Sequence, residues 1–588
     1  MRSLVCRTIA LGLLVLQVAS ANNYTELYRP QYHFTPAKNW MNDPNGLVYF
    51  NGTYHLYYQY NPGGITWGAM SWGHATSGDL IHWEHQPVAL LARGYPGEIT
   101  EMFFSGSAIA DTQNMSGFST NGNVPFVAMY TSYYPITQTL PSGKTVQGGT
   151  QAQSIAYSLD EGMTWTTYDA GNPVIALPPS PYEDQHEEFR DPFVFWHEST
   201  QKWVAVMVLA KLHKVVVYNS ENLKDWTYIS EFGPLNAVGG VWECPGFFPL
   251  PLDGDNEIIK WVLQIGLNPG GPPGVVGSGT QYFVGDFDGT NFVADDTSSP
   301  DDNLTMADET NWMDWGPDFY AAATINGLSM TDRYNIAWMS NWQYAGSIPT
   351  SPWRSAMSVP RKVSLKTINK KATLMQQPAE GLASLETSGS YSKSWDSFPE
   401  GNQRLKLSGK TLDITLTFSN SDPSLALSAA QFGIIIRATS DLAQQTRVGY
   451  DFGTSKLFVD RTKSGNTGFD STFADVYYAP LTPTSDGNVT IQILVDWSSV
   501  EVFGGEGEVT LSTQIFPNDS GTGVLLFSTE GPTSGVTVKA QAIGSAYDRL
   551  VPVLSSSSLV STLTSRSISS LTKTTTASTT FITIDCGP

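Results

Sequence analysis

The stretch TYHLYYQY, residues 53–60, is the first of five similar runs whose order along the chain predicts the fold. Each run is short and rich in aromatic and β-branched residues, as in a strand within a sheet. The others are PFVAMYTSY (125–133), KWVAVMVLA (202–210), KWVLQIGL (260–267) and YNIAWMSNW (334–342), at intervals of roughly 60 to 80 residues. Such a repeat is typical of a β-propeller, in which each blade is one four-stranded sheet. We therefore expect an all-β chain with a five-bladed β-propeller over residues 28–365.

A second repeat follows the first three runs and supports this interpretation. Each copy starts at a serine, continues through turn-forming residues and ends at a tryptophan. The copies are SGDLIHW (77–83), SLDEGMTW (158–165) and SENLKDW (220–226), and a looser version, DFDGTNF (286–292), follows the fourth run. The intervals between blades exceed those of common propeller repeats, so the blades need long loops.

The two ends of the chain differ in composition from the rest. Residues 1–21 combine two arginines, a short apolar core and a small-residue ending, which predicts a secretory signal peptide. A membrane anchor is the weaker alternative, because the apolar run is much shorter than the roughly 20 residues that span a bilayer. Of the 26 residues from 555 to 580, 18 are Ser or Thr, a composition that cannot bury a core. We expect residues 552–588 to form a disordered tail.

Length and composition indicate more than one domain and exclude several kinds of partner. The 588 residues are too many for one core, so two or more domains are expected. A net charge of −22 argues against nucleic acid, whose phosphates require a basic surface, and no segment after the signal peptide is long and apolar enough for a membrane. The 17 Trp and 26 Tyr residues suit stacking against sugar rings, although they also suit a β core. Cys244 and Cys586, which remain after Cys6 leaves with the signal peptide, are too few for a disulfide scaffold.

Polar motifs lie just upstream of all five runs. They are NDP with Asp43, FSGS with Ser105, RDP with Arg190 and Asp191, WECPG with Glu243, and PDFY with Asp318. If each run is the second strand of its blade, these motifs lie on or beside the innermost strands, which line the central channel. Asp43, Asp191 and Glu243 would then meet around one pocket. A turn alone explains the DPNG that begins at Asp43, but it does not explain acids that recur from blade to blade.

Three of these motifs resemble those of a known family. WMNDPNG (40–46), RDP (190–192) and ECPG (243–246), in this order, resemble the signature motifs of the β-fructofuranosidases, glycoside hydrolase family 32. The resemblance extends to about residue 548, and stretches such as YTSYYPITQTLPSGKTVQ (130–147) are most similar to fungal exo-inulinases. It implies a five-bladed β-propeller followed by a β-sandwich. The alternating runs of residues 375–548 fit the sandwich, and residues 366–374 are then the linker.

The family's roles transfer to the matching positions. The resemblance implies that Asp43 is the nucleophile, that Glu243 is the acid and base, and that Asp191 holds sugar hydroxyls. By its position, Arg190 would bind hydroxyls and keep Asp191 ionised, although a structural ion pair between the two is the alternative. The implied substrate-binding residues are Trp40, Asn42, Gln59, Trp67, Phe104, Ser105, Arg190, Trp338 and Asp318. Core packing is the alternative for Trp67 and Phe104.

The resemblance implies a secreted, retaining, exo-acting fructan β-fructosidase that releases terminal fructose from inulin and also cleaves sucrose and levan. Invertase and fructosyltransferase activities remain open, because no local motif separates hydrolysis from transfer. A sugar-binding relative without catalysis would have lost a carboxylate, and all three are present. Arabinan-cleaving five-bladed hydrolases have similar inner-strand acids but lack the NDPNG and ECPG motifs.

No cofactor or metal is expected, because the sequence contains no HExxH, no CxxC and no other clustered ligand spacing. The expected partners are the fructan or sucrose substrate and N-linked glycans. Asn-x-Ser/Thr sequons begin at Asn23, Asn51, Asn114, Asn303, Asn488 and Asn518, and glycans are expected at all but the first. The oligomeric state does not follow from the sequence.

Overall fold

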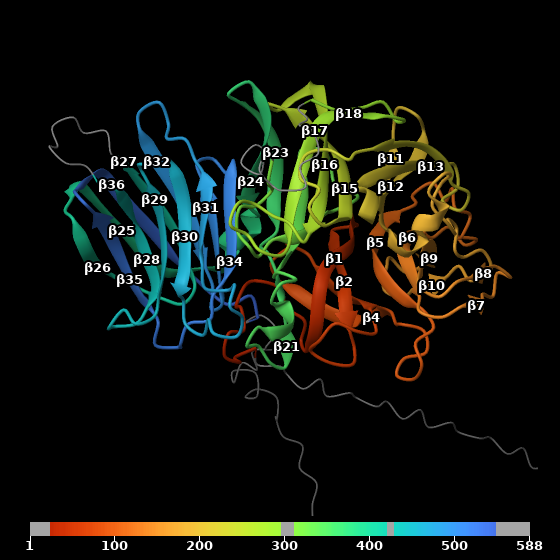
Figure 1. Ribbon diagram of the computed structural model, residues 1–588, viewed down its shortest axis with the longest axis horizontal. Helices are drawn as coiled ribbons and strands as arrows, with labels where there is room; N and C mark the ends of the chain where they lie inside the picture. The colour runs from red at the N-terminus through yellow and green to blue at the C-terminus, as the bar shows by residue number, and fades with distance from the viewer. Residues whose placement is uncertain (1–23, 296–310, 420–428, 548–588) are drawn as a thin grey trace, which may run out of the picture. The chain divides into compact units, whose positions relative to one another are not determined.

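The structure is a computed structural model that describes residues 24–295, 311–419 and 429–547, almost all of whose regular structure is β (Figure 1). The signal peptide expected at 1–21, the tail expected at 552–588, the sequons at Asn23 and Asn303, and Cys6 and Cys586 lie outside these ranges. The helices within them are four short 3-10 helices, η1 (Glu183–Glu188), η2 (Ala210–Leu212), η3 (Ala345–Ser347) and η4 (Glu380–Leu385).

Five antiparallel sheets follow one another along the first part of the chain. The first three contain β1 (Asn39–Phe50), β2 (Thr53–Asn61), β3 (Ser71–Ser77) and β4 (Trp83–Leu90); β5 (Met102–Ala110), β6 (Phe126–Tyr134), β9 (Thr150–Ser158) and β10 (Thr166–Thr167); and β11 (Phe189–His197), β12 (Lys202–Leu209), β13 (Lys214–Ser220) and β14 (Thr227–Phe232). A small hairpin, β7 (Gln138–Thr139) and β8 (Thr145–Val146), interrupts the second.

The fourth and fifth sheets join at their edges. The fourth contains β15 (Val241–Leu252), β16 (Asp255–Asn268), β17 (Gly279–Phe287) and β18 (Phe292–Ala294), and the fifth contains β19 (Tyr320–Thr324), β20 (Tyr334–Met339), β22 (Ala356–Met357), β23 (Arg361–Ile368) and β24 (Lys371–Pro378). A single parallel pairing, Leu252 with Leu365, connects β15 to β23.

The first strands of the five sheets form a closed ring. Strand β1 contacts β5, β5 contacts β11, β11 contacts β15, β15 contacts β19, and β19 contacts β1 again. The late strand β21 (Trp353–Arg354) also pairs with the start of β1. The sheets are therefore the blades of a propeller whose inner strands surround a central channel, which confirms the predicted fold class.

The repeats seen in the sequence have clear structural counterparts. The five apolar runs are β2, β6, β12, β16 and β20, the second strand of every blade. The Ser-to-Trp segments connect the third and fourth strands of their blades. In the first, Ser77 Oγ accepts the backbone N–H of Leu80 at 2.9 Å, and Trp83 Nε1 donates to the Leu80 carbonyl at 3.0 Å. Ser220 and Trp226 make the same two bonds around Leu223. The serine and tryptophan thus fix a tight turn by side-chain bonds.

Two six-stranded antiparallel sheets follow the propeller and face each other as a sandwich (Figure 1). One contains, in spatial order, β25 (Glu386–Phe398), β36 (Thr533–Ile543), β27 (Leu412–Ser419), β32 (Asn488–Val495), β33 (Ser499–Gly504) and β34 (Val509–Gln514); the other contains β26 (Gly401–Ser408), β35 (Gly523–Thr529), β28 (Gln431–Ala438), β29 (Gln445–Asp451), β30 (Lys456–Lys463) and β31 (Val476–Pro480). Alternate residues such as Ile414, Leu416, Ile434 and Ile436 are fully buried in one shared apolar core.

Residues 366–374, which the sequence placed in a linker, lie in the hairpin formed by β23 and β24. The eight-residue register between these strands makes this segment part of the fifth blade. The sequence predicts a linker here because the segment lies between the two predicted domains, and the pairing of β23 with β24 is not visible in the sequence.

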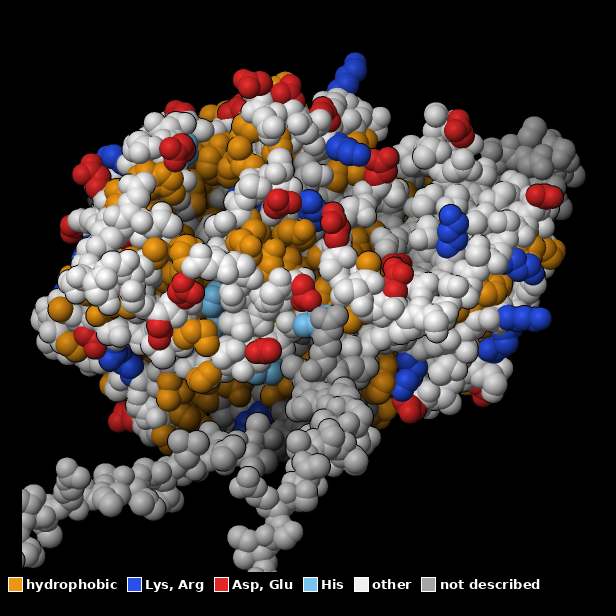
Figure 2. Space-filling view, turned by 180° about the vertical axis from the view of Figure 1, so that it is seen from behind, with side chains coloured by type: hydrophobic (Ala, Val, Ile, Leu, Met, Phe, Trp, Pro, Cys, Tyr) orange, Lys and Arg blue, Asp and Glu red, His pale blue; other side chains and the backbone are white. Residues whose placement is uncertain are grey.

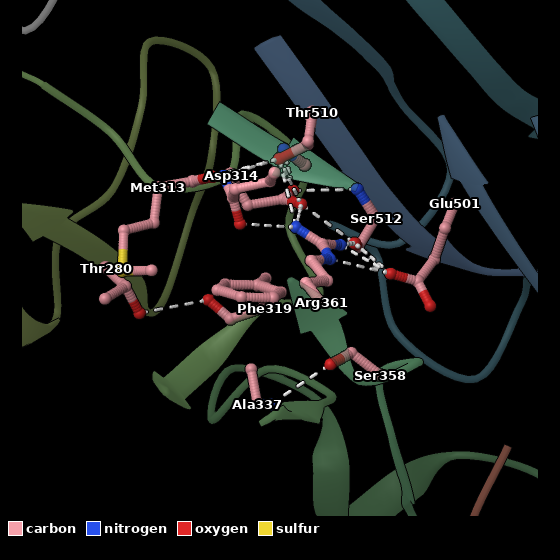
Figure 3. A network of polar contacts seen from close by, with 12 residues as sticks. Thr280, Met313, Asp314, Phe319, Ala337, Ser358, Arg361, Glu501, Thr510 and Ser512 are labelled. Carbon is pink, nitrogen blue, oxygen red and sulfur yellow. Dashed lines mark hydrogen bonds and ion pairs between the residues drawn. The ribbon is translucent and has the colours of Figure 1, made fainter. Parts of the chain in front are cut away.

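A buried ionic network connects propeller and sandwich, as Figure 3 shows. Arg361, on β23, binds Asp314 at 2.9 Å and Glu501, on β33, at 2.5 Å, and all three side chains are fully buried. Arg361 also donates to Ser512 Oγ at 2.5 Å and to Thr510 Oγ1 at 3.0 Å. Because every charge has a partner, the network fixes one arrangement of the two sheets.

The N-terminal segment extends this network. The ring of His33 lies between Asp496 at 2.8 Å and Glu501 at 2.9 Å, with all three side chains buried. These two carboxylates raise the pKa of His33 to about 9 against the opposing effect of burial. Arg361 holds the pKa of Glu501 at about 2 although burial opposes this. The segment before β1 is therefore held in place by buried charges.

Acidic side chains are scattered over the face shown in Figure 2, with basic side chains between them. This face offers no continuous basic stripe of the kind that binds phosphate backbones, in keeping with the net charge of −22. Within the described ranges, no helix is long and apolar enough to cross a membrane.

Candidate active site

Every inner strand has a β-bulge near its start. The register with the second strand shifts between Met41 and Pro44, Phe103 and Gly106, Arg190 and Phe193, Glu243 and Gly246, and Tyr320 and Ala323. A bulge bends the strand and redirects its side chains, and bulges are frequent at barrel rims beside active sites. Here the five bulges gather at one end of the channel, where they bring the predicted acids together.

Asp43 lies in the bulge of β1 and is almost fully buried. Its Oδ1 accepts a hydrogen bond from Asn42 Nδ2 at 2.9 Å, and its Oδ2 accepts one from Ser105 Oγ at 2.8 Å. Burial raises the pKa of Asp43 above its ordinary value and nearby Glu243 raises it further, whereas the bonds from Asn42 and Ser105 lower it. The carboxylate is thus held in one orientation by two donors from different blades.

Asp191 lies in the bulge of β11 with a left-handed backbone, φ 61°. Such a conformation costs a non-glycine residue on the order of 1–3 kcal/mol. Thr131 Oγ1 accepts the backbone N–H of Asp191 at 2.9 Å, and the backbone N–H of Cys244 donates to Asp191 Oδ2 at 2.9 Å. These bonds hold the strained residue with its carboxylate toward β15.

The sequence predicted that Arg190 keeps Asp191 ionised. In the structure, other effects on the pKa of Asp191 outweigh that of Arg190. Arg190 Nε lies 3.8 Å from Asp191 Oδ2 and lowers the pKa of that carboxyl. Burial has the larger effect, and the charges of Glu243 and Asp43 add to it, so that the pKa of Asp191 is raised to about 7. The guanidinium of Arg190 also binds Glu188 and Glu243, and this sharing could not be inferred from the sequence.

Glu243 precedes the bulge of β15 and is held from both sides. Arg190 donates to Glu243 Oε1 from Nε at 3.2 Å and from Nη2 at 3.1 Å, and Tyr320 Oη donates to Oε2 at 2.5 Å. Arg190 also binds Glu188 at 2.5 Å and Gln151 at 3.3 Å. A side chain with both oxygens engaged has one fixed position, as a proton-transfer group requires.

Cys244 lies between two of the acids, again with a left-handed backbone, φ 50°. Its Sγ is 3.4 Å from Asp43 Oδ2 and 3.7 Å from Asp191 Oδ2. Burial, and then the charges of Asp191, Asp43 and Glu243, raise the thiol pKa well above its ordinary value. The neutral thiol is therefore a weak hydrogen-bond donor here, not a nucleophile.

Several of the predicted substrate-binding residues surround the three acids. Trp40 Nε1 donates to Asn42 Oδ1 at 2.8 Å and so orients the amide that binds Asp43. Trp67 is 45% exposed and lies edge-on to Phe104, with ring centroids 6.1 Å apart. Phe104 stacks on Tyr133 at 5.1 Å. An exposed aromatic edge beside buried carboxylates is a surface on which a sugar ring can stack.

Two other predicted residues lie behind this surface. The amide of Gln59 donates to Asn45 Oδ1 at 3.0 Å and to the Phe103 carbonyl at 3.1 Å, which ties β1, β2 and β5 together. Trp338 is fully buried and packs against Trp40 and Trp342, with centroids 6.1 and 4.9 Å apart. Both residues support the site from behind.

Asp318 is not brought to the site. Its carboxylate accepts hydrogen bonds from Tyr344 Oη at 2.6 Å, from Arg461 at 2.7 Å and from the backbone N–H of Gln514 at 2.8 Å. Arg461 and Gln514 belong to the sandwich, so Asp318 contributes to the contact between the two sheet systems.

Tyr320 occupies the place that the sequence had given to Asp318. Arg190, Glu243 and Tyr320 each directly precede the bulge of their strand, and they form a continuous chain of contacts. Counting from the bulge would have selected Tyr320, but a bulge is visible only once the strand register is known.

A turn closes the other end of the channel. Asn326, between β19 and β20, accepts the backbone N–H of Tyr49 at 2.8 Å and donates its own N–H to Leu47 at 3.0 Å. Its side-chain amide donates to the carbonyls of Ala108 and Val194, both at 3.0 Å. This single residue thus bonds to β1, β5 and β11 below the acids, so the site opens at one end only.

The described residues contain no group of three or more His, Cys, Asp or Glu side chains arranged to hold a metal ion. What the site provides is two buried carboxylates, the partly exposed carboxylate of Glu243, one shared guanidinium and a phenol. This set can supply a nucleophile, a proton donor and acceptors for hydroxyl groups without further groups.

Comparison with known proteins places the chain among glycoside hydrolases. The model of the glycosyl hydrolases family 32 N-terminal domain matches residues 33–378, and that of the family 32 C-terminal domain matches residues 381–543. The chain is 59% identical over 533 residues to the extracellular exo-inulinase of Aspergillus ficuum. The match covers 90% of this chain and 97% of that protein. It is 46% identical to a levanase of Bacillus subtilis, over 89% of this chain and 71% of that one.

The fold is also that of a solved relative. The crystal structure of the exo-inulinase from Aspergillus awamori superimposes with a TM-score of 0.86 at 58% identity, covering 89% of this chain and all of that one. The β-sheet architecture derived above is therefore shared with an enzyme of known structure.

Proposed function

The chain belongs to glycosyl hydrolase family 32, and from this premise we propose that it is a secreted, retaining, exo-acting fructan β-fructosidase. Its main substrate would be inulin, and it would also cleave sucrose and levan. The observation that carries the proposal is the set of three carboxylates at the open end of a channel that Asn326 closes.

In this proposal Asp43 attacks the anomeric carbon of a terminal fructofuranosyl unit, and Glu243 gives a proton to the departing oxygen. The covalent fructosyl intermediate is then hydrolysed by a water that Glu243 deprotonates, so the configuration is retained. Ser105 and Asn42 fix the attacking carboxylate, and Arg190 and Tyr320 fix the acid.

Asp191 would accept hydroxyl groups of the bound sugar. Its position beside Cys244 N–H and Arg190 places an acceptor between the nucleophile and the acid. A hydrogen bond to a ring hydroxyl that strengthens as positive charge develops on the sugar lowers the barrier. Trp67 and Phe104 would provide the apolar surface for the ring.

The similarity to exo-inulinases supports exo action, and the closed channel is compatible with it. A chain that passed through the site would need an exit beyond the acids, where Asn326 bonds to three inner strands. A chain therefore cannot pass through the channel, and we propose that its terminal unit enters from the open end and reaches Asp43. The released product is free fructose, and the shortened chain can bind again.

Secretion fits the signal peptide expected at 1–21 and the extracellular relative from Aspergillus ficuum. Glycans are proposed at Asn51, Asn114, Asn303, Asn488 and Asn518. Asn51 lies in the tight turn between β1 and β2, and Asn518 is exposed on the sandwich. The side-chain amide of Asn114 donates a hydrogen bond to the Ser119 carbonyl and accepts one from the Ser119 backbone N–H. Glycosylation of Asn114 would therefore have to precede the formation of this turn.

Two activities of the same chemistry are the alternatives. An invertase would cleave sucrose but not inulin, and a fructosyltransferase would pass the fructosyl group to a sugar hydroxyl rather than to water. The 59% identity to an exo-inulinase over 90% of this chain favours inulin hydrolysis.

A time course of products from inulin and from concentrated sucrose, resolved by chromatography, tests the proposal. Fructose should be the first and main product from inulin, with longer chains shortened gradually. Early products of three and four units would refute exo action. Activity on sucrose alone would identify an invertase, and dominant growth of longer oligosaccharides from sucrose would identify a transferase.

A further inference from the structure

A second pocket lies at the closed end of the propeller, opposite the acids. Its volume is about 580 Å³, within the range of small-ligand sites. It is lined by the ends of β11 and β15, by β16 and β17, and by the β19–β20 turn that contains Asn326. The acids lie at the starts of β11 and β15, so this pocket and the active site occupy opposite ends of the same inner strands.

Aromatic rings form one wall of this pocket. Phe195, Trp261 and Phe287 are in mutual contact, with centroids 5.1 to 6.3 Å apart. Each is 8% exposed, so each keeps a small accessible face although it packs into the core. Trp196 also lines the pocket and is less buried. Flat apolar faces beside a polar opening suit a sugar ring.

Arg333 supplies the polar wall, and its bonding is incomplete. It is 7% exposed, and Nη1 donates to the Ile325 carbonyl at 3.0 Å. Its Nε is buried without an acceptor among the described residues, and its guanidinium lies over the Phe248 ring, 5.6 Å from the centroid. Burial without a counter-charge lowers the pKa of Arg333 to about 10. Because solvent does not reach Nε, a hydroxyl bound in the pocket could accept a hydrogen bond only from the accessible part of the Arg333 guanidinium, which lines the pocket.

The charges at the pocket rim narrow the class of ligand. Glu198 and Asp286 are exposed there, and the carboxylate of Glu198 accepts Trp196 Nε1 at 2.8 Å. Asp286 is paired with Lys260 at 3.0 Å, so Glu198 is the rim carboxylate that disfavours a polyanion, whereas a neutral polyhydroxyl ring suffers no repulsion. The lining thus combines ring-stacking faces, a guanidinium donor and carboxylate acceptors, which is the set of groups that binds a carbohydrate.

We propose that this aromatic pocket is a non-catalytic saccharide-binding site that holds a fructosyl unit of a second part of the polymer or of a neighbouring chain. The inference rests on the proposed function for the identity of the sugar. A second attachment point raises the local concentration of chain ends near the active site without a new catalytic group. The expected benefit is therefore confined to long substrates and absent for sucrose.

Isothermal titration calorimetry of the Asp43→Asn enzyme with a short inulin oligosaccharide tests the proposed saccharide-binding site. Two binding events are expected, one of which disappears in the Asp43→Asn, Arg333→Met double variant. The matched control is Arg437→Met, which removes another buried arginine whose Nε has no acceptor, in the sandwich. A single event in the Asp43→Asn parent, or equal loss in both arginine variants, would overturn the proposal.

Kinetics of the active enzyme provide the second readout. Arg333→Met should raise KM for long inulin about 3- to 10-fold and leave kcat/KM for sucrose unchanged. If Arg333→Met does not fold, Ser199→Trp at the exposed rim blocks the same pocket and should have the same effect. Equal KM for long inulin in the wild type and in the folded rim variant would contradict the site. Absence of inulin cleavage by the wild type would instead refute the proposed function.

Discussion

Tyr320 is a residue whose role depends on one hydrogen bond. Its hydroxyl donates to Glu243 Oε2 at 2.5 Å, and the phenol is buried. Tyr320→Phe should reduce kcat on sucrose about 10-fold, because one hydrogen bond that orients the acid corresponds to ~1.4 kcal/mol of barrier. KM should change little, since the ring keeps its packing. Steady-state kinetics measure the effect.

The control for this change is Tyr282→Phe, which removes a buried hydroxyl that accepts the backbone N–H of Leu374 far from the acids. It should leave kcat unchanged. A kcat in Tyr320→Phe equal to that of Tyr282→Phe would remove Tyr320 from the catalytic arrangement.

We expect Ser105 to affect the acidic limb of the pH profile through Asp43, the proposed nucleophile. The proposed nucleophile must be ionised, so activity should rise as pH increases through the pKa of Asp43, which burial raises above its ordinary value. Ser105 lowers that pKa by donating to Oδ2. Ser105→Ala should therefore move the acidic limb of kcat/KM to higher pH. A limb that stays in place or moves to lower pH would show that another group controls it.

The inner strand is the element that builds the site, and its bulge is the decisive feature. The sequence predicted strands, blades and the three acids, because apolar runs and turn residues are local signals. It did not predict the bulges, which depend on pairing with the next strand. For the same reason it chose Asp318 over Tyr320. Asp318 proved to bind Arg461, which is 143 residues away in sequence.

Strand β23 carries the main ionic contact between propeller and sandwich. Arg361→Met would leave Asp314 buried without its cation and Glu501 with His33 as its one remaining cationic partner. Removing one partner of a buried ion pair typically costs about 3–5 kcal/mol of unfolding free energy. Denaturant unfolding should show a loss of this size. Arg404→Met, at an exposed arginine that bonds to the backbone carbonyls of Thr439 and Ser440, is the control and should cost much less. Equal losses would contradict the role of the network.

At the level of the whole molecule, we expect His33 to make stability depend on pH. Its folded pKa of about 9 lies above the unfolded value of 6.5. Its contribution is therefore fully present below pH 6.5 and is lost as pH rises through 9, with a slope of about 1.4 kcal/mol per pH unit for the one proton involved. His33→Gln should lack this fall between pH 6.5 and 9, while being less stable at pH 6.

Unfolding free energies measured at several pH values compare the two proteins, with His186→Gln, a half-exposed histidine on η1, as control. Parallel curves for the wild type and His33→Gln would show that His33 does not stay protonated in the fold. None of this coupling was visible in the sequence, because His33, Arg361 and Glu501 are far apart along the chain.

The catalytic assignment is tested most directly by the kcat of Asp43→Asn on sucrose and inulin. The amide keeps the size of the side chain but cannot attack the sugar, so the protein should fold with an unchanged melting temperature. Its kcat should fall at least ~10³-fold, which corresponds to about 4 kcal/mol of barrier. A well-folded Asp43→Asn enzyme that retains more than a tenth of wild-type activity would contradict the assignment of Asp43 as the nucleophile.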